Sequence, residues 1–149
     1  TLFRSNVPSL RHLTSQDLPR AKELLDDVTY RRVKHVITEN ERVLDTVKTL
    51  KAQGPTAIGD LMYKSHISMR DYFEISVPEL DLAVEAAFAQ GAIGARMTGG
   101  GFGGAAIALI RTESIQKTTE AIKAAFEKNE YIDPNIFAVE AADGAARVL

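Results

Sequence analysis

Residues 91–111 read GAIGARMTGGGFGGAAIALIR and hold seven of the ten glycines in the chain. Glycine loses more conformational entropy on folding than any other residue, so an ordered cluster of glycines needs a compensating role. Short apolar runs at residues 92–98 and 105–110 flank the cluster, and they are too brief for helices and typical of buried strands. We therefore predict a hairpin of two buried strands joined by a glycine-rich loop.

The predicted loop is the candidate functional site. Glycine allows backbone amides to approach an anionic ligand closely, and it allows turns at positive φ where a Cβ would clash. The loop lacks the Gly-Lys-Ser/Thr ending of a P-loop, and it joins two strands instead of opening a helix as the dinucleotide fingerprint requires. A tight hairpin without a ligand is therefore as good an interpretation of the spacing alone. The candidate site residues are Thr98, Gly99, Gly100, Gly101, Phe102, Gly103 and Gly104.

The region before the hairpin is predicted to be mainly helical over residues 17–90, after a connecting segment at residues 1–16. Asp17 is the predicted N-cap of a short helix. A long amphipathic helix follows from Asp27 and ends at Gly54. Its apolar face recurs at helical spacing and consists of Val33, Val36, Ile37, Val43, Leu44, Val47 and Leu50.

Two more helices are predicted before the hairpin. Pro55 opens the first, which reaches about Arg70. The second begins with a capping box, in which Ser76 is the N-cap and Glu79 lies at the third helical position. Gly91 is the predicted C-terminal stop of this helix.

The region after the hairpin is predicted to contain a helix, residues 113–128, and a last strand, residues 136–141. Residues 91–149 then read as strand, loop, strand, helix and strand. The order of elements predicts an α+β fold in a single domain of residues 1–149, with the strands late in the chain. Three strands make a thin sheet for so many helices, so we expect a further strand from outside these residues.

Composition excludes several classes of function. The net charge is −2 and no basic stripe with interleaved aromatics occurs, so nucleic acid is not an expected partner. Cysteine is absent, which excludes disulfides, cysteine nucleophiles and thiolate metal sites. No apolar run approaches the length of a membrane span, so we expect no membrane association. The first residue is Thr1 and not Met, so we expect the chain to begin partway through a longer gene product.

Histidine offers three candidates for chemistry, namely His12, His35 and His66. None lies three or four residues from another, so no helical metal pair is predicted. His35 lies among apolar positions and is interpreted as a structural histidine. His66 lies between Ser65 and Ser68, but both hydroxyls are expected to bond to helix carbonyls, and no third member of a catalytic triad is specified.

Four acidic residues, Asp71, Glu74, Glu79 and Asp81, lie close together in the sequence and could hold a cation or act as acid and base. Glu79 is explained by the predicted capping box, and Asp81 by its place in the first turns of a helix, where the helix dipole favours a carboxylate. For Asp71 and Glu74 the sequence leaves structural and chemical roles open.

Three segments resemble the GHMP small-molecule kinases, in the form typical of galactokinases. The third conserved motif of that family, a glycine-rich loop between strands that follows Arg-Met-Thr, is similar to GARMTGGGFGGAAIALI. Two further galactokinase segments, in the same order, resemble RRVKHVITENERV and LMYKSHISMRDYFEISVPELD. The resemblance spans about residues 8–149. Tyr72 departs from it, because many members carry an acidic residue there.

The resemblance implies the C-terminal domain of a galactokinase, with a ferredoxin-like sheet, added helices and a first strand that precedes this chain. The full-length enzyme would use ATP and Mg²⁺ to phosphorylate the C1 hydroxyl of galactose in the cytoplasm. The loop, residues 98–104, would help to close the active site.

The same resemblance assigns the family's catalytic Asp and Arg, and its Mg²⁺ ligands, to an N-terminal domain that these 149 residues do not include. No residue of this chain therefore inherits a catalytic or metal-binding role. ATP and Mg²⁺ would be held mainly by that domain, and the isolated chain is expected to be inactive.

Three alternatives stay open. A galactokinase-like regulator would bind sugar and nucleotide without catalysis, and another GHMP sugar kinase would act on a different sugar. The isolated chain could instead be a structural module that associates with a second copy through an open sheet edge. The Arg-Met-Thr-Gly and Pro-Glu-Leu-Asp matches favour a galactokinase over another sugar kinase.

Overall fold

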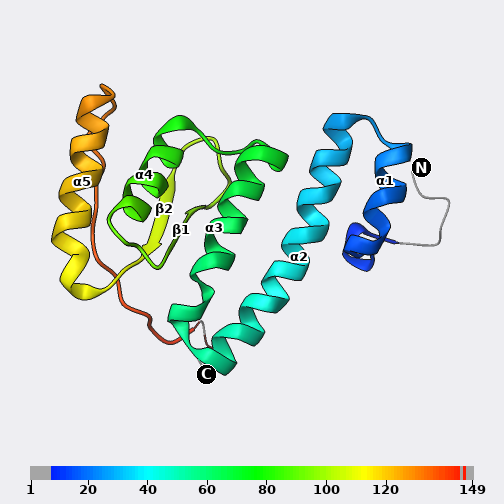
Figure 1. The fold of residues 1–149 in the computed structure, drawn as a ribbon, viewed down its shortest axis with the longest axis horizontal. Coiled ribbons are helices and arrows are strands. Elements are labelled where there is room, and N and C mark those ends of the chain that lie inside the picture. Colours follow the sequence, from blue (N-terminus) through cyan, green and yellow to red (C-terminus); the bar gives the residue numbers. More distant parts are fainter. Residues whose placement is uncertain (1–7, 145, 147–149) are drawn as a thin grey trace.

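The computed structural model describes residues 8–144 and residue 146. Five α-helices and one hairpin form the regular structure of that part of the chain (Figure 1). In chain order these are α1 (Leu18–Leu24), α2 (Asp27–Gln53), α3 (Gly59–Ser68), α4 (Pro78–Ala89), β1 (Gly94–Thr98), β2 (Ala105–Leu109) and α5 (Ile115–Lys128). The predicted α+β class is confirmed.

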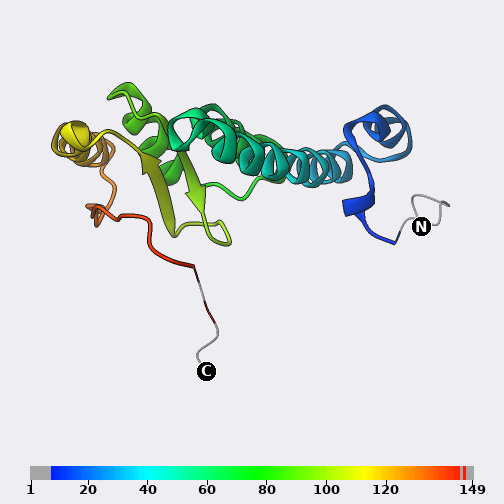
Figure 2. The same cartoon turned by 90° about the horizontal axis from the view of Figure 1, so that it is seen from below.

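The predicted hairpin is also confirmed. β1 and β2 run antiparallel, with Gly94 opposite Leu109 and Thr98 opposite Ala105. The expectation that both strands are buried is wrong for β2, which is mostly exposed. The reason is that α3 and α4 both cover β1, whereas β2 packs mainly against α4. Figure 2 shows the hairpin beneath these helices, with its loop end pointing away from them.

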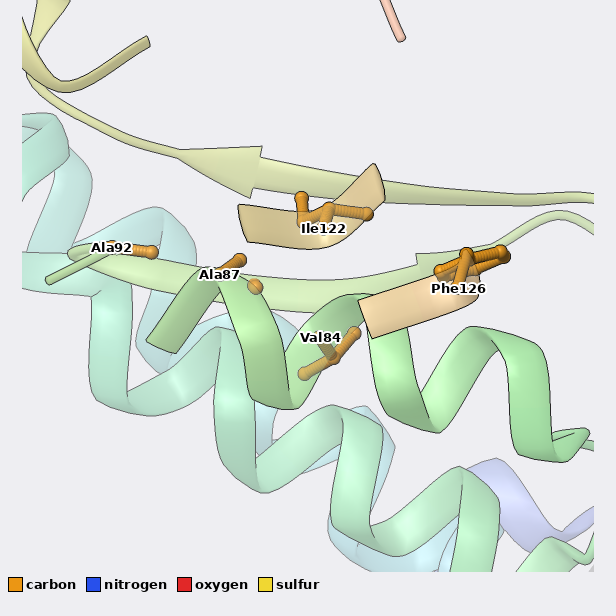
Figure 3. Packing of buried hydrophobic residues seen from close by; sticks show 6 residues of the cluster. Val84, Ala87, Ala92, Ile122 and Phe126 are labelled. Carbon is orange, nitrogen blue, oxygen red and sulfur yellow. The ribbon is translucent and has the colours of Figure 1, made fainter. Parts of the chain in front are cut away.

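The largest core joins α4, α5 and the start of β1. Figure 3 shows Val84 and Ala87 of α4 close to Ile122 and Phe126 of α5, with Ala92 nearby just before β1. Ala95 of β1 completes the cluster, and all six side chains are at least nine-tenths buried. Hydrophobic burial at this junction fixes the strand that leads into the glycine loop.

Two glycines let α3 cross β1 at unusually close range. A Cβ added to Gly59 would lie 1.8 Å from the carbonyl oxygen of Ile93, and one added to Gly94 would lie 2.6 Å from the Cα of Gly59. Neither distance is possible for a real Cβ, and the opposing atoms belong to the backbone. The crossing of α3 and β1 therefore requires glycine at both positions.

The long helix α2 has the predicted limits. The side chain of Asp26 caps it by accepting the backbone N–H of Thr29 over 3.0 Å. Gly54 ends the helix at a φ of 82°, and Pro55 begins the short 3-10 turn Pro55–Ile58 that precedes α3. The helix-to-helix joint predicted at these two residues is confirmed.

The predicted apolar face of α2 is buried only in the first half of the helix. Val33 and Ile37 pack with Leu13 and Ala21 in a core of their own, against α1 and the segment before it. The second half leaves four of the predicted core residues 43–71% exposed, namely Val43, Leu44, Val47 and Leu50. Helical periodicity identified the face, but in the described part of the chain no element lies over its second half.

The two predicted caps fare differently. Asp17 is the N-cap of α1, as predicted, but its side chain makes no bond into the helix, because its carboxylate accepts the N–H of Thr14 three residues earlier. The capping box of α4 is wrong: Val77 is the N-cap, Glu79 is exposed, and the Ser76 hydroxyl donates to Asp81 instead. Ser76 therefore still fixes the start of α4, but through a carboxylate within the helix.

The predicted last strand is wrong. Residues 131–144 have no regular secondary structure, and Phe137 and Val139 are 73% and 76% exposed. A strand requires a neighbour for its backbone hydrogen bonds, and the described residues offer none along this segment. The sheet of the described chain thus has two strands, and the complete ferredoxin-like sheet stays a prediction.

Across residues 8–144, no helix combines the length and the apolar character needed to cross a bilayer.

Candidate functional site

The loop between β1 and β2 has a backbone that side chains rarely adopt. Four of its glycines, Gly99, Gly101, Gly103 and Gly104, have φ values of 85°, 84°, 121° and 93°. Phe102 lies between them at a φ of 59°, in the left-handed region that non-glycine residues seldom occupy. The run of glycines is therefore needed to form this turn at all, whatever the loop binds.

One side of the loop is anchored to the segment before α4. The backbone N–H of Phe102 donates to the carbonyl oxygen of Ile75 over 2.7 Å. A Cβ added to Gly101 would lie 2.5 Å from the same oxygen and 2.6 Å from the Ile75 Cβ. The loop thus rests directly on Ile75, and its shape depends on where Ile75 is held.

The rest of the loop is open. A Cβ added to Gly99, Gly100, Gly103 or Gly104 would have no atom within 4 Å, and the Phe102 side chain is 76% exposed. Thr98, the last residue of β1, is half-buried beside the loop. These positions leave backbone amides and one aromatic ring accessible to a ligand or to another surface.

An ion-pair network holds the residue that precedes Ile75. Glu74 has a φ of 58° and ends the π-helical turn Met69–Phe73. Its carboxylate accepts Arg31 Nη2 over 2.6 Å and Arg32 Nη2 over 2.5 Å, both from the first turns of α2. The hydrogen bond from Arg32, with the charge of Arg31, lowers the pKa of Glu74 below its ordinary value. This network assigns Glu74 a structural role that the sequence left open.

A buried histidine supports the strand below the loop. His66 is 1% exposed, and its Nδ1 accepts the backbone N–H of Met97 over 3.3 Å. Its Nε2 lies 3.2 Å from Asp81 Oδ1 but in a direction that gives no hydrogen bond. Burial lowers the pKa of His66, although the negative charge of Asp81 acts in the opposite direction. The ring therefore joins α3, β1 and α4 in its neutral form.

The serines beside His66 bond to side chains and not to helix carbonyls, contrary to the sequence interpretation. Ser65 donates to Glu39 of α2, which also pairs with Arg42. Ser68 lies 2.9 Å from Nδ1 of His35. Because both serines bond to side chains of α2, they tie α3 to that helix. Neither bonds to His66, and the contact of Ser68 with His35 is buried in the interface of α2 and α3.

His35 is a structural histidine, as predicted. It is 7% exposed, and its ring stacks on Phe73 with centroids 4.6 Å apart. Burial lowers the pKa of His35 as well. His35 thus lies where α2 contacts α3, and His66 lies where α3 contacts β1.

The acidic cluster predicted from residues 71–81 is dispersed by the fold. Asp71 pairs with its neighbour Arg70, Glu74 with α2, and Asp81 with Ser76. Among residues 8–144, no three His, Asp or Glu side chains come together in a way that could hold a metal ion. The donors needed for Mg²⁺ are therefore not gathered in the described part of this chain.

Sequence reasoning missed two features of this site. The role of Arg31 and Arg32 was not predicted, because their partner Glu74 lies more than 40 residues away in the chain. Gly59 and Gly94 were not singled out, although a glycine at the start of a predicted helix was a usable signal. The resemblance to a family did point to the loop, to the segment that contains Glu74 and Ile75, and to the part of α2 that contains the arginines.

Comparison with known proteins agrees with this arrangement. The family model described as GHMP kinases C terminal matches residues 46–128, which is more than half of the chain. This chain belongs to that family. The match includes α3, α4, the hairpin and α5, and so covers the helices that pack on β1 as well as the glycine loop.

Several curated relatives are galactokinases. The chain is 43% identical to the galactokinase of Streptomyces coelicolor over 145 residues, 45% identical to that of Glaesserella parasuis and 41% identical to that of Mycobacterium tuberculosis. These alignments cover 96%, 93% and 94% of this chain, but 38%, 37% and 39% of the relatives. The chain thus spans less than two fifths of the length of each.

A solved structure supports the same relationship. The fold of this chain superimposes on Lactococcus lactis galactokinase complexed with galactose with a TM-score of 0.80 and 34% sequence identity. The superposition covers 85% of this chain and 33% of the other.

Proposed function

We propose that residues 1–149 form the C-terminal domain of a cytoplasmic galactokinase, an enzyme that transfers the γ-phosphate of ATP to the C1 hydroxyl of galactose. The observation that carries this proposal is the 43% identity to a galactokinase across 96% of the chain. The proposed substrates are therefore galactose and ATP.

The glycine loop, residues 98–104, would contribute one wall of the active site. Phosphoryl transfer depends mainly on positioning and on electrostatic stabilisation of the transferred group. Gly99, Gly100, Gly103 and Gly104 have open space where a side chain would stand, which would let a phosphate approach their backbone, and backbone amides interact favourably with phosphate oxygens. The exposed ring of Phe102 would meet the N-terminal domain or a substrate.

The remaining parts of the site would lie outside this chain. The catalytic Asp and Arg and the Mg²⁺ ligands would then lie in the N-terminal domain. In support, residues 8–144 gather no cluster of His, Asp and Glu side chains that could hold a metal ion. Mg²⁺, when bound there, would neutralise charge on the ATP phosphates. This chain alone is accordingly expected to show no ATP-dependent turnover.

A fusion enzyme tests the proposal. In it, the part of Streptomyces coelicolor galactokinase that this chain does not match precedes residues 1–149. The expected result is ATP- and Mg²⁺-dependent phosphorylation of galactose, with other hexoses converted much more slowly. The unfused chain and the unfused Streptomyces segment are the controls, and neither should turn over.

The Streptomyces segment supplies the proposed catalytic residues, so the outcome tests what residues 1–149 contribute. A fusion enzyme that unfolds cooperatively but has no turnover, or that prefers another sugar, would show that these residues do not complete a galactokinase active site. Either result would overturn the proposal as stated.

A further inference from the structure

We propose that Glu74 is a positioning residue for the glycine loop, and that Arg31 and Arg32 hold it in place. The inference deepens the proposed function, because it rests on a role of the loop in catalysis. It identifies a physical connection between the first turns of α2 and a loop about 70 residues later in the chain. The two arginines bond to Glu74 and Tyr72, and none of these bonds reaches the loop.

The first link is the arginine fork, which is the pair of bonds from Arg31 and Arg32 of α2 to the Glu74 carboxylate. The two arginines approach different carboxylate oxygens, Arg31 at Oε1 and Arg32 at Oε2, so both acceptor sites are used. Arg32 also donates through Nη1 to the carbonyl oxygen of Tyr72 over 2.5 Å. A single exposed ion pair contributes little, but a planar guanidinium that bonds two groups of one turn fixes their relative orientation.

The second link is the backbone of Glu74. A φ of 58° is costly for a residue with a Cβ, and such conformations persist only where the surroundings enforce them. Here the surroundings are the two arginines on one side and the π-helical turn Met69–Phe73 on the other. The left-handed conformation reverses the chain direction and directs the next residue, Ile75, toward the hairpin.

The third link is the contact of Ile75 with the loop. Its carbonyl oxygen accepts the Phe102 N–H over 2.7 Å, and its N–H donates to the Met69 carbonyl over 3.1 Å. Gly101 lies so close to Ile75 that even a methyl group would collide with it. The position of Ile75 therefore sets the position of residues 101 and 102, and Glu74 sets the position of Ile75.

Amide hydrogen exchange, followed by NMR on the ¹⁵N-labelled 149-residue chain, tests this connection. In Glu74→Ala the Phe102 amide is expected to exchange at least about threefold faster than in the wild type, because the loop loses its fixed acceptor more often. The amide of Ile122, in the core of α5, should keep its rate. The matched control is Asp60→Asn, which breaks the exposed ion pair with Lys64 on α3 and should leave Phe102 unchanged.

Two further variants separate the effect of the arginine fork from the effect of the positive φ at residue 74. Glu74→Gly adopts a positive φ without strain but has no carboxylate, so it should also speed Phe102 exchange. Glu74→Gln keeps one acceptor oxygen and should give an intermediate rate. Wild-type exchange of Phe102 in Glu74→Gly, or in Glu74→Ala, would overturn the proposal, because the arginine fork would then have no effect on the loop.

Kinetics of the fusion enzyme test the catalytic consequence. Glu74→Ala should lower kcat for galactose phosphorylation at least about threefold with a smaller change in KM, since a displaced loop disturbs positioning more than binding. Asp60→Asn should match the wild type. Unchanged kinetics in an active fusion enzyme would overturn the catalytic role of Glu74, whereas an inactive wild-type fusion enzyme would count against the proposed function and leave the exchange result to decide the positioning role.

Discussion

The buried ring of His66 accepts the backbone N–H of Met97 at Nδ1, across 3.3 Å. A backbone amide can only donate, so this nitrogen carries no proton, and the neutral ring bears its proton at Nε2 on the side of Asp81. Met97 is itself fully buried, one residue before the loop begins at Thr98. The protonation state of His66 thus affects its hydrogen bond to β1, the strand that leads into the glycine loop.

Stability should fall at mildly acidic pH because of this arrangement. Burial lowers the pKa of His66 and of His35, so the unfolded chain binds more protons than the folded one once the pH drops below about 6.5. The free energy of unfolding should therefore decrease from pH 7.5 to pH 5.5, by up to about 1.4 kcal/mol per pH unit for each histidine. Urea unfolding at several pH values measures this slope.

Matched variants assign the pH dependence to the buried rings. His66→Gln should be less stable than the wild type at pH 7.5 and should lose less stability on acidification. His12→Gln replaces an exposed histidine and should keep the wild-type slope. A wild-type slope in His66→Gln would show that its ring is not excluded from protonation in the folded chain.

Gly59→Ala and Gly94→Ala should destabilise the chain by about 1–3 kcal/mol or more, because each added methyl group meets backbone atoms that cannot move aside. The control is Gly100→Ala, where the added Cβ has no neighbour within 4 Å and φ is not positive. It should change the free energy of unfolding by less than about 0.5 kcal/mol. Equal effects at the three glycines would contradict the close crossing of α3 and β1.

Two isoleucines near the C-terminal end provide a test of the main core. Ile122 is 9% exposed in α5, whereas Ile132 is 91% exposed after it. Ile122→Ala should lower the free energy of unfolding by about 2–5 kcal/mol, and Ile132→Ala by less than about 0.5 kcal/mol. Chemical denaturation of both variants measures these changes in the free energy of unfolding. Comparable losses of stability in the two variants would mean that residues 131–144 pack differently in solution.

The hairpin predicts self-association of the isolated chain. In residues 8–144, β2 pairs only with β1, and Ile107 is half-exposed on the strand. An open edge of this kind can pair with a second copy, and an added charge opposes that pairing. Light scattering should show a concentration-dependent increase in mass for the wild type and a smaller one for Ile107→Lys. A monomer at every concentration would refute pairing through this edge.

The sequence predicted the elements whose formation depends on residues close together in the chain. Gly54-Pro55 indicated a helix joint, and short apolar runs on both sides of the glycines indicated the hairpin, because these signals act over a few residues. The α4 cap was wrong because the Ser76 hydroxyl donates to the Asp81 carboxylate instead of accepting a backbone N–H, and Val77 is the N-cap.

Features that depend on distant segments could not be predicted in the same way. The strand expected at residues 136–141 has suitable residues but no neighbouring strand in the described chain, and pairing is a property of two segments. Glu74 was identified as a candidate, yet its role depends on Arg31 and Arg32, which only the fold brings within 3 Å. The loop residues themselves were found from composition, whereas their support by Ile75 was not.

By our proposal the glycine loop takes part in phosphoryl transfer, and Gly100→Val in the fusion enzyme is the sharpest test of that role. Gly100 is the one loop glycine with open surroundings and without a positive φ, so a larger side chain there should leave folding intact. Gly101→Val is less informative, since its side chain would collide with Ile75. We predict that Gly100→Val lowers kcat/KM for galactose at least about tenfold with an unchanged unfolding midpoint. Wild-type kcat/KM in this folded variant would contradict the claim.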